Sequence, residues 1–302
     1  MSTLKDLKVR IKTVKSSQKI TKAMKMVAAS KLRKARDAIL INRNYSEKLL
    51  HLLKVVGSEL RSRRRFPMIF GREHPKSVLV ISVSSDRGLC GAFNSNVAKS
   101  TQSLIAELKS HGKSVRVLSI GKKSYDLMKT HMNNIEIFQT EAKGPSVDDA
   151  IKITASLMWN FREEKIDECY LVYNEFVSVV SQQIKKFQLL PFNVYKKLED
   201  SEKTEDDKYD ESMKASYHIC EPHPMEIIND MITDVIAACI YRAMLENAAS
   251  EHGARMTAMD NASRNAGEMI KKLNVQYNRI RQTAITTELI EIISGAEAIN
   301  DG

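Results

Sequence analysis

The sequence has few of the residues that interrupt helices or build β-rich cores. Its 302 residues include 11 glycines, 6 prolines and a single tryptophan, Trp159, and aromatic residues make up 6% of the chain. Scarce turn formers and scarce aromatics argue against a β-rich fold and favour long helices. The hydrophobic content of 43% still allows a packed core, and the length allows one large domain or two smaller ones.

Cysteine is also scarce and widely spaced. The four cysteines are Cys90, Cys169, Cys220 and Cys239, and none of them forms a CxxC pair. This spacing argues against a disulfide framework or a zinc site and indicates a reducing compartment. The sequence has no apolar run of the ~20 residues that a membrane span needs. The basic N-terminus has the composition of a transit peptide, but its pattern continues past any plausible cleavage point, which predicts folded structure.

Positive charge is concentrated at one end of the chain. The net charge is +10, and residues 1–65 carry 19 Lys/Arg against 4 Asp/Glu, a local balance of +15. The rest of the chain carries 28 basic and 33 acidic residues and is therefore weakly acidic. The basic segment favours an anionic partner: nucleic acid, lipid headgroups or acidic protein loops.

The first segment, residues 1–57, has the pattern of one long helix. Eleven of sixteen positions taken at alternating steps of three and four are apolar, which predicts a coiled-coil seam rather than a strand. The seam positions are Leu4, Leu7, Ile11, Val14, Gln18, Thr21, Lys25, Ala28, Leu32, Ala35, Ile39, Asn42, Ser46, Leu49, Leu53 and Val56. Such a helix would be roughly 80 Å long. The polar seam residues either set the register or mark where another protein replaces the helical partner.

Residues 76–195 alternate between predicted strands and helices. The buried-type run 77–83 comes first, and further strands are predicted at 115–120, 135–138, 170–176 and about 183–189. Helical patterns lie between the first four strands, at 94–111, 122–131 and 147–164. This alternation predicts a Rossmann-like, mostly parallel sheet with helices on its faces, and the last two strands are close enough in sequence to form an antiparallel edge.

A second long helix is predicted at the C-terminal end, over residues 217–300, after an acidic surface loop at 196–214. Gly253 and Gly267 lower its helix propensity by about 1 kcal/mol each, so length and packing have to carry the helix past them. Its apolar stripe is expected to comprise Ile228, Ile232, Val235 and Cys239, followed by Met259, Ala262, Ala266, Met269, Leu273, Gln276 and Ile280. The fold class is therefore α/β plus a long antiparallel coiled coil that the two end helices form.

One loop has a position that suits ligand binding. Residues 84–94 follow a predicted strand and precede a predicted helix, and in an open α/β sheet ligands bind at such a place. Gly88 and Gly91 match neither the GxGxxG nor the GxxxxGKS/T phosphate-binding pattern, so a structural turn is the favoured interpretation. Asp86 and Arg87 fit a local ion pair or a partner contact equally well.

The sequence contains no evident catalytic or metal-binding constellation. Cys90 has no nearby His–acid pair, which favours a small buried cysteine over a nucleophile. The seven histidines show no HExxH or other ligand spacing. The acidic run at 199–211 lacks the EF-hand pattern. Met24 and Met26 lie among basic residues, and this mixture of apolar and positive side chains indicates an external contact surface.

Three stretches resemble signatures of the F-type ATP synthase γ subunit family. Residues 19–34 (KITKAMKMVAASKLRK) are similar to its N-terminal signature, and residues 278–296 (NRIRQTAITTELIEIISGA) to its C-terminal one. Residues 84–94 (SSDRGLCGAFN) are similar to its central loop. The three stretches occur in the family's order and span nearly the whole chain, so chance agreement is implausible.

The resemblance implies a rotor subunit that has no catalytic residue and no cofactor of its own. In this family the two end helices form a shaft inside a ring of three α and three β subunits, and catalysis takes place on β. The α/β domain forms part of a foot beside the ε subunit and the membrane c-ring. The basic end of this chain would then face acidic β loops.

The resemblance also implies contact residues. Met24 and Lys25 match shaft residues beside the β lever loop, and Arg255 matches a basic residue in the same zone. Arg281 and Gln282 match a pair that hydrogen-bonds a β catch loop. These positions are carried over from the family motifs.

Near the foot the sequence departs from the family. Glu221 matches a residue near the c-ring, but Cys220 stands where the family often has tyrosine, which puts aromatic packing there in doubt. The 196–214 loop lacks the paired cysteines of chloroplast relatives, so thiol regulation is not expected. The family motif begins almost at Met1, which favours the cytoplasmic face of a bacterial inner membrane, with the mitochondrial matrix face as the alternative.

Two other functions compete with this interpretation. A nucleic-acid-binding coiled-coil protein would explain the basic first helix and predicts salt-sensitive DNA binding. A small α/β enzyme that uses the Gly88–Gly91 loop predicts nucleotide binding by the isolated chain. Neither explains the motifs at both ends.

Overall fold

The computed structural model describes residues 4–58, 67–130, 132, 134–140, 144–179, 181–192 and 224–300. The chain divides into two compact units, which we call the stalk unit (residues 1–30 and 255–302) and the sheet unit (residues 31–254). The boundaries between them cut through two long helices, α1 (Leu4–Ser58) and α8 (Pro224–Asn300). The sequence predicted other ranges, in which each long helix forms a domain of its own, and those ranges stay a prediction. The predicted 196–214 loop lies outside the described residues.

Both long helices expected from the sequence are present. Helix α8 runs without a break through Gly253 and Gly267. Along α1, every predicted seam position from Leu4 to Leu49 is buried or half-buried, and most other positions are exposed. The alternating spacing of three and four therefore identified the inward face of α1 correctly.

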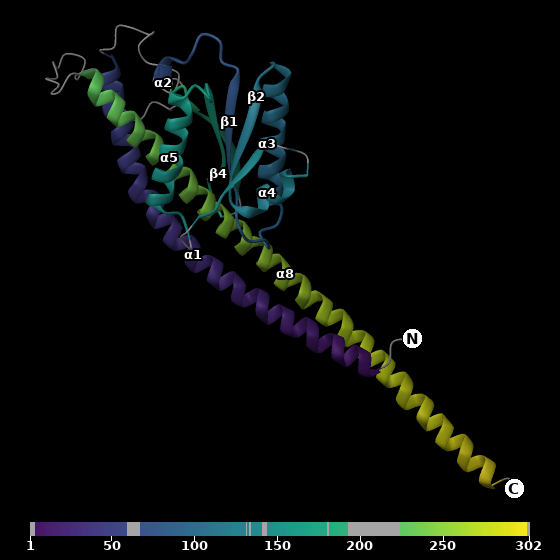
Figure 1. The fold of residues 1–302 in the computed structure, drawn as a ribbon. Coiled ribbons are helices and arrows are strands. Elements are labelled where there is room, and N and C mark those ends of the chain that lie inside the picture. Colours follow the sequence, from purple (N-terminus) through teal and green to yellow (C-terminus); the bar gives the residue numbers. More distant parts are fainter. Residues whose placement is uncertain are drawn as a thin grey trace. The chain divides into compact units, whose positions relative to one another are not determined.

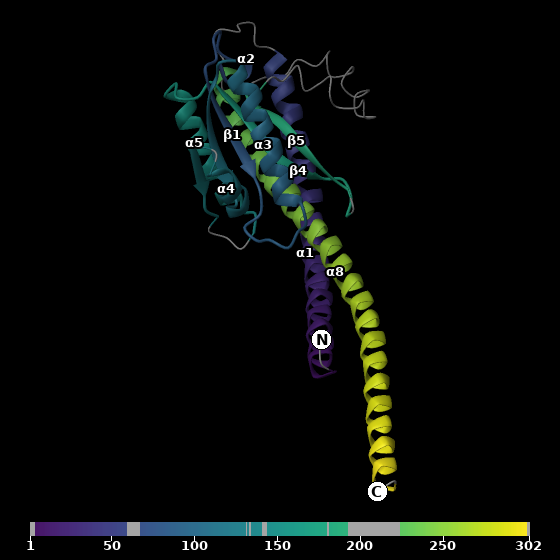
Figure 2. The same cartoon turned by 90° about the vertical axis from the view of Figure 1, so that its right-hand side faces the viewer.

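Within the stalk unit the two helices pair in antiparallel fashion (Figures 1 and 2). The Gln18 amide donates to the carbonyl of Ser263 at 3.2 Å, and Lys25 Nζ lies 2.6 Å from Asp260 Oδ1. As the residue number rises along α1, its partner's number on α8 falls, which defines the antiparallel direction. Two polar seam residues, Gln18 and Lys25, thus contact α8.

The seam of α8 in the stalk unit follows the predicted stripe at five of its seven positions. Met269 and Gln276 are exposed, and the other five are buried or half-buried. The prediction left out Ser263, which is 6% exposed in the same seam. The Gln18 amide binds the backbone carbonyl of this serine. Gly267 makes room for this contact, because a Cβ there would lie 3.1 Å from Gln18 Nε2.

The sheet unit is built on five strands in the order β3-β2-β1-β4-β5. The strands are β1 (Ser77–Val83), β2 (Ser114–Ile120), β3 (Ile135–Phe138), β4 (Glu168–Phe176) and β5 (Gln182–Leu190). The first four are parallel, and β5 pairs antiparallel with β4. This mostly parallel sheet with an antiparallel edge confirms the prediction.

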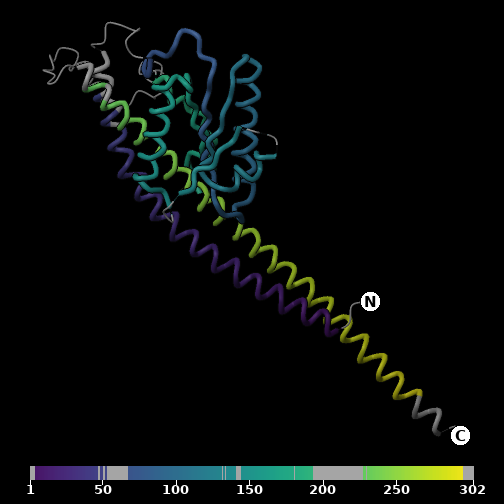
Figure 3. Tube along the Cα trace, in the orientation of Figure 1, coloured from purple at the N-terminus to yellow at the C-terminus, as the bar shows by residue number. Residues whose placement is uncertain are grey.

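Helices cover both faces of the sheet (Figure 3). Along β1, Val78 and Val80 join the core under α3 (Phe93–Ser110), while Leu79 and Ile81 point to the opposite face. That opposite face packs against α5 (Val147–Arg162) and the first part of α8, which contributes a row of buried apolar residues. The described part of the unit also contains two short helices, α2 (Pro67–Phe70) and α4 (Lys122–Met128), and α2 was not expected from the sequence.

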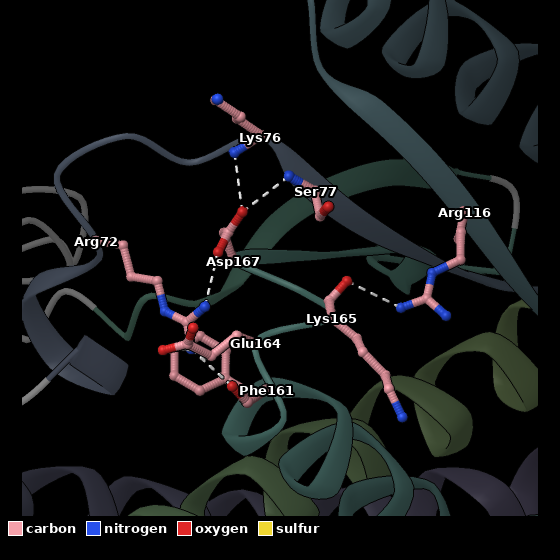
Figure 4. Close-up of polar contacts among 8 residues, drawn as sticks. All are labelled: Arg72, Lys76, Ser77, Arg116, Phe161, Glu164, Lys165 and Asp167. Carbon is pink, nitrogen blue, oxygen red and sulfur yellow. Dashed lines mark hydrogen bonds and ion pairs between the residues drawn. The ribbon is translucent and has the colours of Figure 1, made fainter.

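A buried carboxylate joins three segments where the strands begin (Figure 4). Asp167 accepts hydrogen bonds from the backbone N–H groups of Lys76 and Ser77, both at 2.9 Å. The Arg72 guanidinium lies 2.9 Å from the same carboxylate, donates to the Phe161 carbonyl and stacks 4.9 Å from the Phe161 ring. Burial by itself raises the pKa of Asp167, but these donors outweigh it and the pKa is lowered.

Candidate interaction sites and family

The loop of residues 84–92 connects β1 to α3 at the carboxyl edge of the sheet, where the sequence placed a candidate site. Ser85 donates through both its N–H and its hydroxyl to Asn94 Oδ1, at 3.1 and 2.9 Å. Cys90 is buried at 2% exposure, and the Asn94 amide donates to its sulfur. These hydrogen bonds hold the loop in a fixed turn, which agrees with the structural interpretation.

The two predicted contact residues of this loop differ in their surroundings. The Asp86 carboxylate accepts from the backbone N–H of Lys122 at 3.0 Å. It thereby pairs one of the N–H groups that the first turn of α4 leaves without a partner in the helix. Arg87 is exposed, and its carbonyl accepts the Ser85 hydroxyl at 2.7 Å. The exposed Leu89 has a φ of 66°, a conformation that L-residues seldom adopt. Asp86, Arg87 and Leu89 are all exposed, so the loop offers these three side chains to a partner.

Helix α8 occupies the place where a sheet of this kind binds ligands. Doubly wound sheets bind ligands where the strand order reverses, outside the carboxyl ends of the strands. Here that place lies between β1 and β4. The Asn247 amide donates to the carbonyl of Ser84, just after β1, and the Ser250 hydroxyl donates to the carbonyl of Asn174, in β4, both at 3.2 Å. The chain's own helix thus fills the crevice that a nucleotide would need.

In the stalk unit, Met24, Lys25 and Arg255 lie half-buried on the two helices. Lys25 is tied to α8 by Asp260, which also contacts Arg264 at 3.1 Å. The Lys25 hydrogen bond lowers the pKa of Asp260, burial opposes it, and the positive charges of Lys25 and Arg264 add to the lowering, so that the pKa is lowered on balance. This contact stabilises the pair at neutral pH, and it is lost as the pH falls through that lowered pKa. Lys25 therefore has a role inside the chain in addition to the predicted partner contact.

A double-mutant cycle separates these two roles of Lys25. Lys25→Met in the native background is expected to lower the thermal midpoint of the chain, because it leaves Asp260 without its closest cation. The same change in an Asp260→Asn background is expected to have little effect on that midpoint. A loss of partner binding that persists in the Asp260→Asn background would assign Lys25 to a partner contact as well.

Arg281 and Gln282 lie where the helix pairing ends. Helix α8 continues past the start of α1 (Figure 3). Every described side chain from residue 281 to 294 is exposed. Several of these exposed side chains are large and apolar, namely Ile285, Leu289, Ile290, Ile292 and Ile293. An exposed apolar helix end of this kind indicates a surface that another protein covers. Glu221, the predicted foot contact, lies outside the described residues.

Sequence reasoning missed two residues that the structure places at these sites. Asp260 pairs with Lys25, and Asn247 binds the carbonyl of Ser84. Spacing along one helix does not show which polar residue on another helix or loop lies opposite. Asn247 had no distinguishing sequence signal, because another polar residue, Ser250, is buried on the same part of the helix.

The fold and the contact surfaces define a two-helix stalk protein with an attached α/β unit, whose sites suit partner binding and not catalysis in a pocket. A family model described as ATP synthase matches residues 3–299. The chain is 42% identical to the ATP synthase gamma chain of Pelagibacter ubique, over 99% of this chain and 100% of that relative. It is also 42% identical to the gamma chain of Rhodospirillum rubrum, with the same coverage. The chain belongs to the ATP synthase gamma chain family.

Solved structures of mitochondrial ATP synthases share the fold. The central stalk and c-ring structure from Tetrahymena thermophila matches with a TM-score of 0.58 and 26% identity, covering 81% of this chain and 99% of that one. The rotor from Euglena gracilis matches with a TM-score of 0.64 and 21% identity, covering 93% and 98%. Among the described residues no helix is both long and apolar enough to cross a membrane.

Proposed function

We propose that this chain is the central-stalk rotor subunit of a proton-translocating F-type ATP synthase, which couples rotation of the c-ring to ATP synthesis and hydrolysis on the β subunits. Family membership over residues 3–299 carries the proposal. The chain is a non-catalytic subunit. Its partners are the α and β subunits, three of each, together with the ε subunit and the c-ring.

The stalk unit supports a mechanical role. Two paired helices resist twisting and bending better than one, because contacts such as those from Gln18 and Lys25 oppose sliding between them. An asymmetric shaft inside a ring of three β subunits contacts each β subunit differently. Each catalytic site therefore has a different nucleotide affinity, and rotation changes those affinities in turn.

The contact residues are assigned by position and chemistry. Met24, Lys25 and Arg255 are proposed to lie beside the β lever loop, and Arg281 with Gln282 to hydrogen-bond the β catch loop. The exposure of residues 281–294 supports the second assignment. The balance of +15 in residues 1–65 supports contact with acidic β loops, because opposite charges steer and orient partners.

Asp86, Arg87 and Glu221 are assigned to the remaining contacts. The exposed Arg87 supports a partner contact by the 84–92 loop. Glu221 is proposed to lie near the c-ring, with the family's tyrosine position taken by Cys220.

The location of the chain follows from the complex. Membrane association is peripheral, through the c-ring. We place it on the cytoplasmic face of a bacterial inner membrane, with the matrix face of the mitochondrial inner membrane as the alternative. The gamma chains of Pelagibacter ubique and Rhodospirillum rubrum, which match along their full length, support the first.

Co-purification tests the proposed function. A tagged version of this chain, expressed with its native subunits and purified at physiological salt, is expected to bring down α, β and ε subunits in a complex that hydrolyses ATP. The isolated chain is expected to bind neither ATP nor DNA in calorimetry. Recovery without α and β subunits, or salt-sensitive DNA binding by the isolated chain, would contradict the proposal.

A further inference from the structure

We propose that Asn247 is a positioning residue that ties the 84–92 loop to helix α8, so that the loop and the helix move as one body. The inference rests on the proposed function, because the movement in question is that of the rotor. It assigns a role to a residue in the interior of the sheet unit that is not itself a predicted partner contact.

The contacts of Asn247 join three elements. Its amide nitrogen donates to the Ser84 carbonyl at 3.2 Å, and its amide oxygen accepts from the Asn174 amide at 3.5 Å. One turn further along α8, the Ser250 hydroxyl donates to the Asn174 carbonyl at 3.2 Å. Asn247, Asn174 and Ser250 are at most 3% exposed, so water does not replace these hydrogen bonds.

The Ser84 carbonyl is held from its other side as well. Gly121, which follows β2, has a φ of 100°, and a Cβ at this position would lie 2.6 Å from the Ser84 oxygen. The Ser84 hydroxyl accepts from the backbone N–H of Ser124 at 3.1 Å. The start of the loop is therefore enclosed between the β2–α4 connection and α8.

Directional contacts are needed here because apolar packing alone does not fix the position of a helix along its axis. The first part of α8 packs on the sheet through side chains such as Ile236, Ile240 and Ala243. Apolar burial is non-directional and resists separation more than it resists sliding or rotation. The hydrogen bonds of Asn247 and Ser250 connect particular atoms of α8 to β4 and to the loop, and so fix both rotation and translation.

The same loop exposes Arg87 and Leu89. With Ser84 tied to α8, a rotation of the helix carries these side chains with it at a constant angle. Without this tie, the loop lags behind the helix, and part of the rotation is lost before it reaches the partner.

The experiment uses the assembled complex with Asn247→Leu, which keeps the side-chain size and removes both hydrogen bonds. Asn247→Asp is the second variant, because it keeps the shape but replaces the donor with an acceptor that faces the Ser84 carbonyl. Asn274→Leu, an exposed asparagine on the same helix, is the matched control. Complexes are compared where subunit composition matches the native one, and the thermal midpoint of each is recorded beside the result.

Hydrogen exchange measures how firmly Asn247 holds the 84–92 loop. In both Asn247 variants, the peptide that covers residues 84–92 is expected to exchange about fivefold faster, the factor that corresponds to the loss of one ordinary hydrogen bond. The Asn274→Leu complex is expected to match the native rate. Unchanged exchange in both Asn247 variants would overturn the proposed tie.

The coupling of proton pumping to ATP hydrolysis measures the role of Asn247 in rotation. The ratio of protons pumped to ATP hydrolysed is expected to fall in both Asn247 variants and in Arg87→Ala. Because Asn247 acts through the loop, the double variant Asn247→Leu, Arg87→Ala is expected to have the same ratio, within about twofold, as the single variant with the lower ratio. Additive effects, an unchanged ratio despite faster exchange, or a normal ratio in Arg87→Ala would overturn the role. Co-purification with α and β subunits would still support the proposed function in each of these cases.

Discussion

Replacing both Arg281 and Gln282 with alanine is expected to lower ATP turnover by the assembled complex at least about tenfold. Hydrogen bonds to charged groups contribute about 1.5–3 kcal/mol each, and about 1.4 kcal/mol corresponds to a factor of ten. Both side chains are exposed in the stalk unit and project from the point where α8 leaves its pairing with α1. The measurements are ATP hydrolysis by the purified complex and ATP synthesis in energised proteoliposomes.

The neighbouring pair Asn278 and Arg279 provides the control for this prediction. It offers the same chemistry, an amide and a guanidinium, and both side chains are also exposed on α8. The two pairs share one face of the helix, because residues three or four apart are neighbours there, but they lie about one turn, roughly 5.4 Å, apart along its axis. The double alanine variant at 278 and 279 is expected to retain most of the turnover. Equal losses from the two pairs, or normal turnover without Arg281 and Gln282, would contradict the catch-loop assignment.

Asp167→Asn is expected to lower the free energy of unfolding of the sheet unit by about 3 kcal/mol. The carboxylate, whose side chain is 12% exposed, holds the Arg72 guanidinium and two backbone N–H groups. Removing one partner of a buried ion pair leaves the other charge uncompensated, which costs about 3–5 kcal/mol. An asparagine keeps one acceptor and therefore recovers part of this. Denaturant unfolding of the native and variant chains measures the difference.

The pH dependence of stability provides an independent test of the Asp167 contact. Its pKa is lowered in the folded chain, so its contribution is fully present above about pH 4, the ordinary value for aspartate. The contribution is lost as the pH falls through the lowered pKa, and the difference between the native chain and Asp167→Asn should shrink in that range. Glu164→Gln is the control, because Glu164 is 80% exposed and lies 3.9 Å from Arg72. A similar loss from this control would argue against a specific role of Asp167.

Local sequence patterns predicted the elements of the fold well for a physical reason. Buried strands such as β1 are short apolar runs, and the inward face of α1 repeats every three to four residues. Both signals depend on which side of an element faces away from water. The parallel direction of the first four strands was also predicted, because a helix between two consecutive strands makes a crossover connection.

The same patterns failed where a polar group lies in a buried position. The predicted α8 stripe left out Ser263 because no apolar side chain marks that position, and it included Met269, which is exposed. Gln18 on the opposite helix binds the backbone carbonyl of Ser263, a contact that no side-chain pattern shows. Asn247 was not recognised for the same reason, since its partner Ser84 lies 163 residues away in the sequence.

The sequence by itself determined the kind of elements, their order and the family, because the spacing of apolar residues and the three long motifs are local properties of the chain. Tertiary structure alone decided the register of the stalk helices, the binding of Lys25 by Asp260, and the filling of the sheet's crevice by α8. Each of these depends on a hydrogen bond or an ion pair between residues far apart in the sequence. Such a contact forms only when packing brings its two atoms within about 3 Å.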